Sequence, residues 1–244
     1  MEMQCGSGDG NKAINYMSNY LEKNVVVGPF QCNCRILVCK KTASAVLIDP
    51  GDDADQILEE IKKIESELKK TISVKALFHT HAHLDHIGAT RKIKESFSDQ
   101  ENSPKIFLNE ADLELYRNLK KQGSLFGFQY EDPLEVDQFY NHEEKFKVGE
   151  MKFTVVHTPG HSPGSVCIRM HEDSSLGNAE TLYSGDTLFQ GSVGRTDLWG
   201  ANEEQMFKSI HERILTLDGD TRVCPGHGPE SKVGVEKKGN PFLR

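Results

Sequence analysis

Apolar residues in the first third of the chain follow two different periods. Short runs of strand length fall at 25–27, 36–39 and 45–48, and the last ends at Asp49-Pro50-Gly51, a turn sequence that stops a strand. Between 52 and 70 the apolar residues return every three or four positions, which is the spacing of an amphipathic helix. The next apolar run predicts a strand over 71–78.

The rest of the chain repeats this alternation, and a short helix is also predicted near the start, over 12–23. Helices are predicted over 87–97, 110–119 and 203–217, strands over 105–108, 151–156, 165–170, 181–184 and 221–224, and an irregular segment over 120–144. The strands form two groups, one in each half of the chain. Two sheets packed face to face with helices outside would bury both groups.

No repeat or long linker divides the 244 residues. We expect a polar, glycine-rich extension over 1–22, partly disordered, followed by a single domain over 23–244. The net charge of −8 argues against a nucleic-acid partner, and the absence of a long apolar run argues against a membrane span. Six cysteines without zinc-finger spacing and the lack of a secretory signal favour a cytoplasmic protein.

Four histidines and an aspartate crowd the turn after the predicted strand 71–78, which reads HTHAHLDH over 79–86. Clustered imidazoles gain little from one another without a cation, so packing explains this turn poorly. In extended backbone His81 and His83 point the same way and would clasp one metal ion. A turn at Leu84 would aim Asp85 and His86 at a neighbouring position, whereas His79 fits a packing role better.

One turn cannot complete a catalytic zinc site, which uses three protein ligands and a water. Three further candidates each follow a predicted strand and stand beside glycine or proline: His161 in HTPGHSPGS, Asp186 in LYSGDTLF and His227 in VCPGHG. Small neighbours keep the backbone tight and let a ligand side chain approach an ion. Strand ends are also where rigid scaffolds present functional groups.

Taken in order, HTHAHLDH, TPGHSPGS, SGDTLF and CPGHG resemble the metal-site motifs of the metallo-β-lactamase superfamily. Within it, FQGSVGRTDLWG and the ending GHGPESKVGVEKKGNPFL resemble the compact glyoxalase II-like, or hydroxyacylglutathione hydrolase, group. The resemblance covers roughly residues 25–243. It implies an α/β fold of the four-layer αββα sandwich type, with 23–244 as one metallo-β-lactamase-like hydrolase domain.

Carried over position by position, the resemblance implies two zinc ions, with iron or manganese as other metals that such donors accept. The first would be bound by His81, His83 and His161, the second by Asp85, His86 and His227, and Asp186 would bridge both beside a hydroxide. Asp85 and Asp186 would thus serve catalysis directly. Two cations lower the pKa of a shared water, so that hydroxide exists at neutral pH.

Three positions outside this set are weaker candidates. Asp49 matches a family position that hydrogen-bonds a ligand imidazole, although it also reads as an ordinary strand-ending residue. Arg195 lies in a family loop and is a candidate substrate contact, but pairing with Asp197 is the favoured interpretation. Lys232 belongs to a basic tail that could attract an anionic substrate carboxylate or simply be solvated.

The leading hypothesis is hydrolysis of S-2-hydroxyacylglutathione, such as S-lactoylglutathione, to a 2-hydroxy acid and a thiol. The expected partner is this small thioester, with no nucleic acid, membrane or obligate protein partner. Only 17 residues follow His227, so we expect this protein to resemble the compact members, without the helical domain with which longer glyoxalase II enzymes grip glutathione.

The main alternative is a mononuclear iron persulfide dioxygenase, which shares HxHxDH and a GRTD-like loop but typically lacks a PGHG-type ligand. His227 within CPGHG therefore favours two metals and hydrolysis. A β-lactam, amide or ester hydrolase is a second alternative. A nuclease is disfavoured by the acidic balance, and a metal-binding module without catalysis by the presence of all the ligands.

Overall fold

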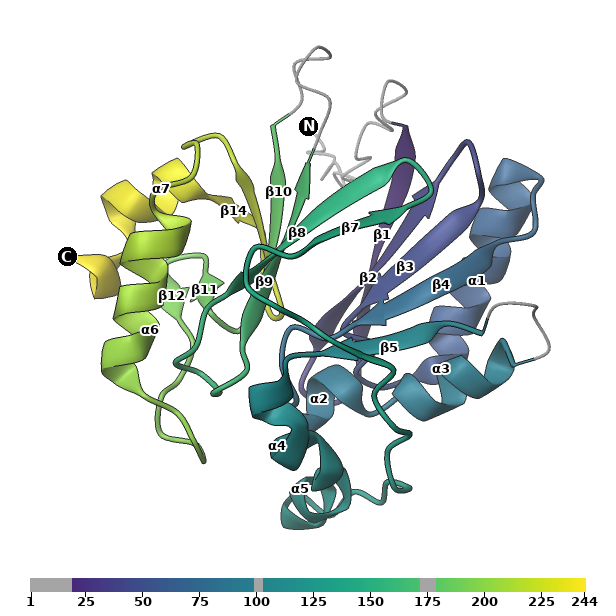
Figure 1. The fold of residues 1–244 in the computed structure, drawn as a ribbon, viewed down its shortest axis with the longest axis horizontal. Helices are drawn as coiled ribbons and strands as arrows, with labels where there is room; N and C mark the ends of the chain where they lie inside the picture. Colours follow the sequence, from purple (N-terminus) through teal and green to yellow (C-terminus); the bar gives the residue numbers. More distant parts are fainter. Residues whose placement is uncertain (1–18, 99–102, 172–178) are drawn as a thin grey trace, which may run out of the picture.

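Two mixed sheets lie face to face with helices outside each of them in the computed structural model, which describes residues 19–98, 103–171 and 179–244 (Figure 1). The first sheet has the order β1-β2-β3-β4-β5-β6 and the second the order β14-β13-β10-β9-β8-β7. The strands of the first sheet are β1 (Tyr20–Val27), β2 (Cys32–Cys39), β3 (Ser44–Ile48), β4 (Ser73–Phe78), β5 (Lys105–Leu108) and β6 (Gln138–Phe139). Those of the second are β7 (Lys145–Val148), β8 (Met151–His157), β9 (Val166–His171), β10 (Thr181–Gly185), β13 (Arg222–Pro225) and β14 (Ser231–Lys232). A separate two-stranded sheet pairs β11 (Leu188–Phe189) with β12 (Ser192–Val193).

Helices cover the outer face of each sheet and give the αββα layering (Figure 1). The first sheet is covered by α1 (Ala54–Leu68) and α3 (Thr90–Ser96), and the second by α6 (Glu203–Ser209) and α7 (Val233–Gly239). The remaining α-helices are α2 (Leu84–Ile87), α4 (Leu113–Arg117) and α5 (Leu119–Leu125). A π-helical segment (Ile210–Ile214) continues α6, and short 3-10 helices span Glu110–Asp112 and Pro241–Leu243. The four-layer sandwich predicted from the sequence is confirmed.

Strand β2 shows why the sequence folds into layers. All of its residues are buried, and successive side chains point to opposite faces of the sheet. Ile36 and Val38 pack on the helix side with α1, while Leu37 and Cys39 face the second sheet. A central strand covered on both faces is apolar on both faces, so it reads as a continuous apolar run rather than an alternating one.

The N-terminal prediction needs a correction. The helix over 12–23 is wrong for Tyr20–Lys23, because these residues begin β1, which pairs antiparallel with β2 from Tyr20 opposite Cys39 to Val27 opposite Cys32. The proposed domain start at residue 23 therefore falls inside a strand. The rest of the predicted N-terminal extension, residues 1–18, lies outside the described residues.

Other differences concern helix boundaries and edge strands. The helix over 87–97 is two pieces, α2 and α3, separated at Gly88 and Ala89, and the segment 120–144 contains most of α5 and the edge strand β6. The edge strand β7, which the sequence interpretation missed, pairs with β8. Across the described ranges, no helix has the length and apolar content that a membrane crossing requires.

The topology places the chemistry at one edge of the sandwich. β3 and β4 are parallel in the first sheet, and β10 and β13 are parallel in the second. Asp49 directly follows β3, the histidine-rich turn follows β4, Asp186 follows β10, and His227 comes just after β13. Because parallel strands end at the same edge, the turns that carry the candidate ligands meet there.

Candidate metal centre

The turn after β4 separates one structural histidine from the others. His79 is fully buried, with Nδ1 3.0 Å from the carbonyl oxygen of Phe107 and Nε2 2.7 Å from Oγ1 of Thr90. Both ring nitrogens are therefore occupied by hydrogen bonds. This agrees with the packing role expected for His79 and leaves the rest of the turn for the site.

Three histidines from two distant turns form the first group of donors. His81, His83 and His161 place ring nitrogens within 4.8 Å of one another. Nδ1 of His83 lies 2.8 Å from Nε2 of His161, and the ring of His81 is edge-on to both neighbouring rings. Two ligands at about 2.0–2.1 Å on a tetrahedral ion are roughly 3.3 Å apart, so this group is compact enough for one ion.

The second group combines Asp85 and His86 of α2 with His227 after β13. Nε2 of His227 lies 3.1 Å from Oδ2 of Asp85 and 3.2 Å from Nε2 of His86. Nε2 of His86 is 3.7 Å from the same Asp85 oxygen. The three donors converge from both sheets, since α2 follows β4 of the first sheet and His227 follows β13 of the second.

Asp186 lies between the two groups. Its Oδ2 is 3.6 Å from Nε2 of His161 in the first group and 3.6 Å from Nε2 of His227 in the second. Its Oδ1 is 3.4 Å from Nε2 of His86. One carboxylate therefore borders two adjacent positions, which is the geometry of a bridging ligand.

The pKa shifts differ between the groups. Burial, followed by the neighbouring imidazoles, lowers the pKa of His81 well below its usual value. Burial and the proximity of His161 likewise lower the pKa of His83, to about 3. Both rings are therefore neutral at physiological pH, which is the form that binds metals.

The second group carries charge instead. Burial alone would lower the pKa of His86, but the carboxylates of Asp186, Asp85 and Asp49 around the ring raise it above the usual value. The pKa of Asp186 is below its usual range because His86, His161 and His227 outweigh the effect of burial. A metal ion at this group would take the place of the proton on His86.

Two features of the described residues fit a resident metal. Nε2 of His81 and Oδ1 of Asp186 are buried and have no hydrogen-bond partner within the described ranges, which is costly for polar atoms unless a cation satisfies them. Gly226 keeps the approach open: a Cβ there would meet Oδ1 of Asp186 at 2.4 Å and Cε1 of His86 at 2.6 Å. The nitrogen and oxygen donors suit zinc, iron and manganese.

Asp49 orients one ligand of each group. Its Oδ2 lies 3.0 Å from Nδ1 of His86 and accepts the hydroxyl proton of Thr80 at 2.7 Å, while its Oδ1 accepts the backbone N–H of Thr80 at 2.7 Å. The Thr80 hydroxyl is in turn 3.1 Å from Nδ1 of His81. These contacts place the Nδ1 protons of both rings toward Asp49 and Thr80, which leaves the Nε2 atoms for a metal.

Asp112, just before α4, joins the two ligand turns and was missed by the sequence interpretation. Its Oδ2 accepts the backbone N–H of Ala82 at 3.0 Å and the hydroxyl of Ser162 at 2.7 Å. Its Oδ1 accepts the backbone N–H of Gly164 at 2.6 Å. Burial raises the pKa of this carboxyl, although these donors oppose the shift. In the sequence Asp112 stands in an ordinary helix start, NEAD, so no local signal marks it.

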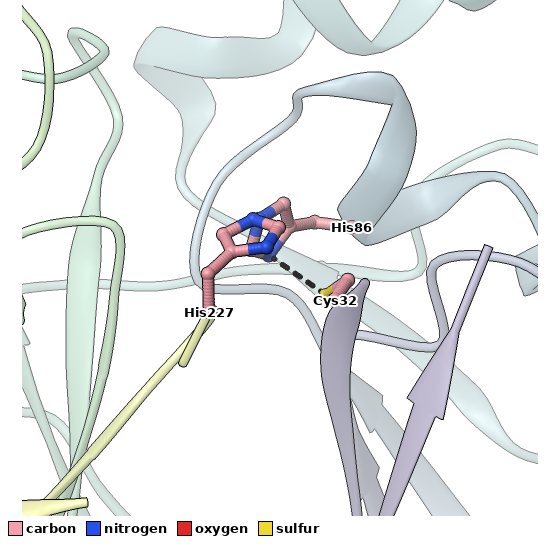
Figure 2. Close-up of side chains that lie close together, drawn as sticks. All are labelled: Cys32, His86 and His227. Carbon is pink, nitrogen blue, oxygen red and sulfur yellow. Dashed lines mark hydrogen bonds between the residues drawn. The ribbon is translucent and has the colours of Figure 1, made fainter. Parts of the chain in front are cut away.

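Cys32 is a second contact that the motifs did not reveal. Figure 2 shows Cys32, His86 and His227 converging from β2, α2 and the segment after β13. The Cys32 sulfur lies 3.7 Å from Nδ1 of His86, and the backbones of Cys32 and His227 form an isolated β-bridge. Burial raises the pKa of the Cys32 thiol to about 12. The protonated thiol packs behind the His86 ring, on its Nδ1 side.

The two candidate substrate contacts lie outside this cluster. The Arg195 carbonyl oxygen is 2.8 Å from Nδ1 of His161, but its guanidinium is paired with Asp197 at 2.6 and 2.8 Å. Lys232 lies opposite Arg222 at the start of β13, away from its carboxyl end, and pairs with Asp220 at 3.0 Å. The structure thus brings together the predicted ligands and Asp49, but not these two side chains.

Histidine and aspartate donors gathered at strand ends of an αββα sandwich define a metallo-hydrolase class of protein. The chain belongs to the metallo-β-lactamase superfamily, whose sequence profile matches residues 27–227. The resemblance noted in the sequence is thereby confirmed.

The chain also matches two known relatives over nearly their full length. The chain is 34% identical over 220 residues to hydroxyacylglutathione hydrolase GloC of Haemophilus influenzae, covering 90% of this chain and 96% of the relative. It is 35% identical over 223 residues to the probable metallo-hydrolase YqgX of Bacillus subtilis, covering 91% and 96%.

Among solved structures, the BLEG-1 B3 metallo-β-lactamase matches with a TM-score of 0.76 and 34% identity, covering 91% of this chain and 99% of the other. TTHA1623 in a di-iron-bound form matches with a TM-score of 0.75 and 34% identity, covering 91% and 100%. ETHE1 from Myxococcus xanthus, at 23% identity and a TM-score of 0.69, covers 91% and 83% and shows the shared fold alone.

Proposed function

We propose that this protein is a two-metal thioester hydrolase that cleaves S-2-hydroxyacylglutathione-type substrates to a 2-hydroxy acid and a thiol. The observation that carries the proposal is the position of Asp186, whose Oδ2 is 3.6 Å from a donor of each histidine group. A carboxylate shared between two adjacent positions favours a pair of ions. The same observation argues against the alternative function, a mononuclear iron dioxygenase.

Two divalent cations would supply an activated water at neutral pH and would polarise the thioester carbonyl. The protein's own residues hold and orient these groups. The Asp85 and Asp186 carboxylates are partly exposed, at 18% and 12% of their side-chain surface, so water can reach them. Because the pKa values of both are lowered, they are ionised and able to accept hydrogen bonds from the attacking water.

The chemistry of the bond explains why no separate acid is needed. Water adds to the carbonyl carbon, the C–S bond breaks, and the sulfur leaves as a thiolate that takes up a proton from solvent. A thiolate is a good leaving group, so the reaction tolerates a site built almost wholly from metal donors. GloC, named as a hydroxyacylglutathione hydrolase, supports this choice of substrate class.

Zinc is the metal that we propose, since the donors combine imidazole nitrogens with carboxylate oxygens in two compact groups. The di-iron form of TTHA1623 makes iron the comparison to test. A cytoplasmic location is also proposed. It is supported by the free, buried thiols of the described cysteines, which suit a reducing compartment.

The first experiment follows the loss of S-D-lactoylglutathione by thioester absorbance with zinc-loaded and iron-loaded protein, beside metal analysis. We expect two ions per chain and turnover that His161→Ala abolishes. His211→Ala, an exposed histidine in the π-helical segment, is the matched control and should keep wild-type turnover. Well-metallated protein that hydrolyses no thioester would refute the proposal.

β-Lactam hydrolysis is the second candidate, because BLEG-1 is described as a B3 metallo-β-lactamase and shares 34% identity. A chromogenic cephalosporin belongs in the same assay. Turnover of the cephalosporin above that of the thioester would replace the leading proposal with this one.

A further inference from the structure

Large apolar side chains that are normally buried lie exposed on segments anchored to the metal-binding turns. Phe30, Leu125, Phe126, Leu198 and Trp199 expose 38%, 83%, 55%, 36% and 58% of their surface. Single exposed apolar residues are common, but a set gathered around a polar site marks a binding surface. We call these five side chains the apolar rim.

One side of the rim is tied to the second donor group. Phe30 precedes Cys32, whose backbone bridges to His227 and whose sulfur touches His86. The Phe30 ring meets Phe126 edge-on, with ring centres 5.2 Å apart. The turn between β1 and β2 and the end of α5 therefore form one aromatic surface.

Helix α5 is itself fastened to the ligand turn. The side chain of Gln122 accepts the backbone N–H of Leu84 at 3.0 Å and donates to the carbonyl oxygen of Ala82 at 3.0 Å. Leu84 and Ala82 flank the ligand His83 in the chain. The exposed Leu125 and Phe126, which end α5, are therefore held beside the donors rather than on a remote surface.

The other side of the rim is tied to the first donor group. Leu198 and Trp199 follow Arg195, whose carbonyl oxygen is 2.8 Å from Nδ1 of His161. Gly200, at φ +74°, packs so closely on the Pro163 ring that a Cβ would come within 2.8 Å of it. In Figure 1 the segment between β12 and α6 and the helices α4 and α5 lie along the same lower edge of the sandwich.

The two cations predicted as substrate contacts are already paired. The Arg195 guanidinium is neutralised by Asp197, and Lys232 pairs with Asp220 away from the site. Glutathione offers carboxylates that need cations, whereas the rim offers aliphatic and aromatic surface. The rim therefore complements the apolar part of a substrate.

We infer that the rim binds the acyl group of the thioester, and that this group is apolar, such as a medium-length alkyl or arylalkyl chain. The inference rests on the proposed thioester hydrolysis, but it replaces the short 2-hydroxyacyl group of that proposal with an apolar acyl group. A lactoyl group is short and polar and would leave the rim unused. Each fully buried methylene is worth about fourfold in affinity, so contact along two or three of them predicts at least about a tenfold preference.

The kinetic test holds the thiol constant. S-acetyl-, S-lactoyl-, S-butanoyl- and S-octanoylglutathione are compared on the metal-loaded protein, and kcat/KM should be at least about tenfold higher for octanoyl than for acetyl. Phe126→Ala and Trp199→Ala should each lower this octanoyl-to-acetyl ratio severalfold. Phe242→Ala is the matched control, because Phe242 is 53% exposed but lies at the C-terminal end, and it should leave the ratio unchanged.

A ratio near one, or one that the rim variants do not alter, would overturn the inference while leaving thioester hydrolysis intact. Failure to hydrolyse any of the thioesters would instead defeat the proposed function, and a binding measurement would then decide the inference alone.

Trp199 supplies that binding measurement, because it is the only tryptophan in the chain. Its fluorescence is titrated with octanoate and with acetate, the two acids that hydrolysis would release. Octanoate should change the emission at concentrations at least about tenfold lower than acetate, and Phe126→Ala should reduce that difference. Equal responses to the two acids would overturn the inference, whether or not the protein hydrolyses thioesters.

Discussion

The carboxylate of Asp49 lies 3.0 Å from Nδ1 of His86 and, through the Thr80 hydroxyl, also reaches Nδ1 of His81. Asp49 adopts a positive φ of 51° directly after β3, which turns its side chain back toward the neighbouring strand end. One strand-ending residue thus fixes the orientation of an imidazole in each donor group. The role expected of Asp49 from the sequence agrees with this geometry.

Replacing this carboxylate should weaken metal binding without removing a ligand. In Asp49→Asn an amide NH2 group replaces Oδ2, the oxygen that accepts from both His86 and the Thr80 hydroxyl. Partners of this kind typically contribute about 10–100-fold to metal affinity. We expect about that loss for the more weakly held ion, measured by competition with a chromogenic chelator. Asparagine also tolerates positive φ, so the fold is retained. Unchanged affinity for both ions would show that Asp49 serves only the turn.

Asp112 should matter for stability even in the metal-free protein. Asp112→Asn places an amide among three donors, from Ala82, Ser162 and Gly164, and hydrogen bonds to charged groups contribute about 1.5–3 kcal/mol each. Because some of this is recovered by rotation of the amide, we expect a loss of about 2–4 kcal/mol in urea unfolding. Asp132→Asn, at an exposed carboxylate, is the matched control and should change stability by less than about 0.5 kcal/mol. Similar values for the two variants would contradict the role of Asp112 as a tie between the ligand turns.

The two donor groups should respond differently to pH. The pKa values of His86 and His227 are raised, so protons compete with metal at the second group near neutral pH. The pKa values of His81 and His83 are lowered, so these two donors of the first group are already free of protons at pH 6. Affinity for the second ion should therefore rise more steeply from pH 6 to pH 8, with release of protons, than affinity for the first.

Calorimetric titration with zinc in buffers of different ionisation enthalpy measures both the affinity for each ion and the number of protons released. His227→Ala is the informative variant, because it removes one of the two proton-binding ligands of the second group, and it should weaken the more strongly pH-dependent step while leaving the other step unchanged. Two binding steps with the same pH dependence would contradict the assignment of the charges.

The ligand turns were predictable because their information is local. HTHAHLDH, PGH and GHG each combine donors with the small residues that the backbone needs at a strand end. The layered fold was also predictable, since the continuous apolar run of β2 indicates a strand covered on both faces. Even β7 carries a signal that the interpretation overlooked, because Lys145 and Lys147 alternate with the half-buried Phe146 and Val148.

Long-range partnerships were not predictable. Asp112 meets Ala82 and Gly164 from positions far away in the chain, and nothing in its own surroundings distinguishes it from a helix-start residue. Cys32 resembles an ordinary core thiol until the structure places its sulfur beside His86. The first part of β1, before the predicted strand 25–27, was hidden for a related reason: Glu22, Lys23 and Asn24 look unsuited to a strand until their partners are known.

The partners of β1 are charged side chains from both sheets. Glu22 of β1 contacts Arg35 of β2 at 3.2 Å and also Arg222 of β13, and Glu230 contacts Arg35 at 2.8 Å. The Arg35 side chain is only 4% exposed and that of Glu22 12%. The network therefore links the first sheet to the second, and its most buried members are Arg35 and Glu22. Removing the Glu22 charge leaves Arg35 and Arg222 to share Glu230 alone.

Glu22→Gln should lower the unfolding free energy by less than the roughly 3–5 kcal/mol of a fully uncompensated buried charge, because Glu230 still pairs with both arginines, but by more than a surface pair contributes. Glu131→Gln is the matched control, because Glu131 pairs with Arg91 at 3.5 Å with its side chain 82% exposed, where an ion pair contributes at most about 1 kcal/mol. Urea denaturation at low and high salt measures the unfolding free energy of both variants. The loss in Glu22→Gln should persist at high salt, because a buried network is screened far less than a surface pair. A loss that disappears with salt would mean that solvent reaches the network and that apolar packing alone holds β1 to the sandwich.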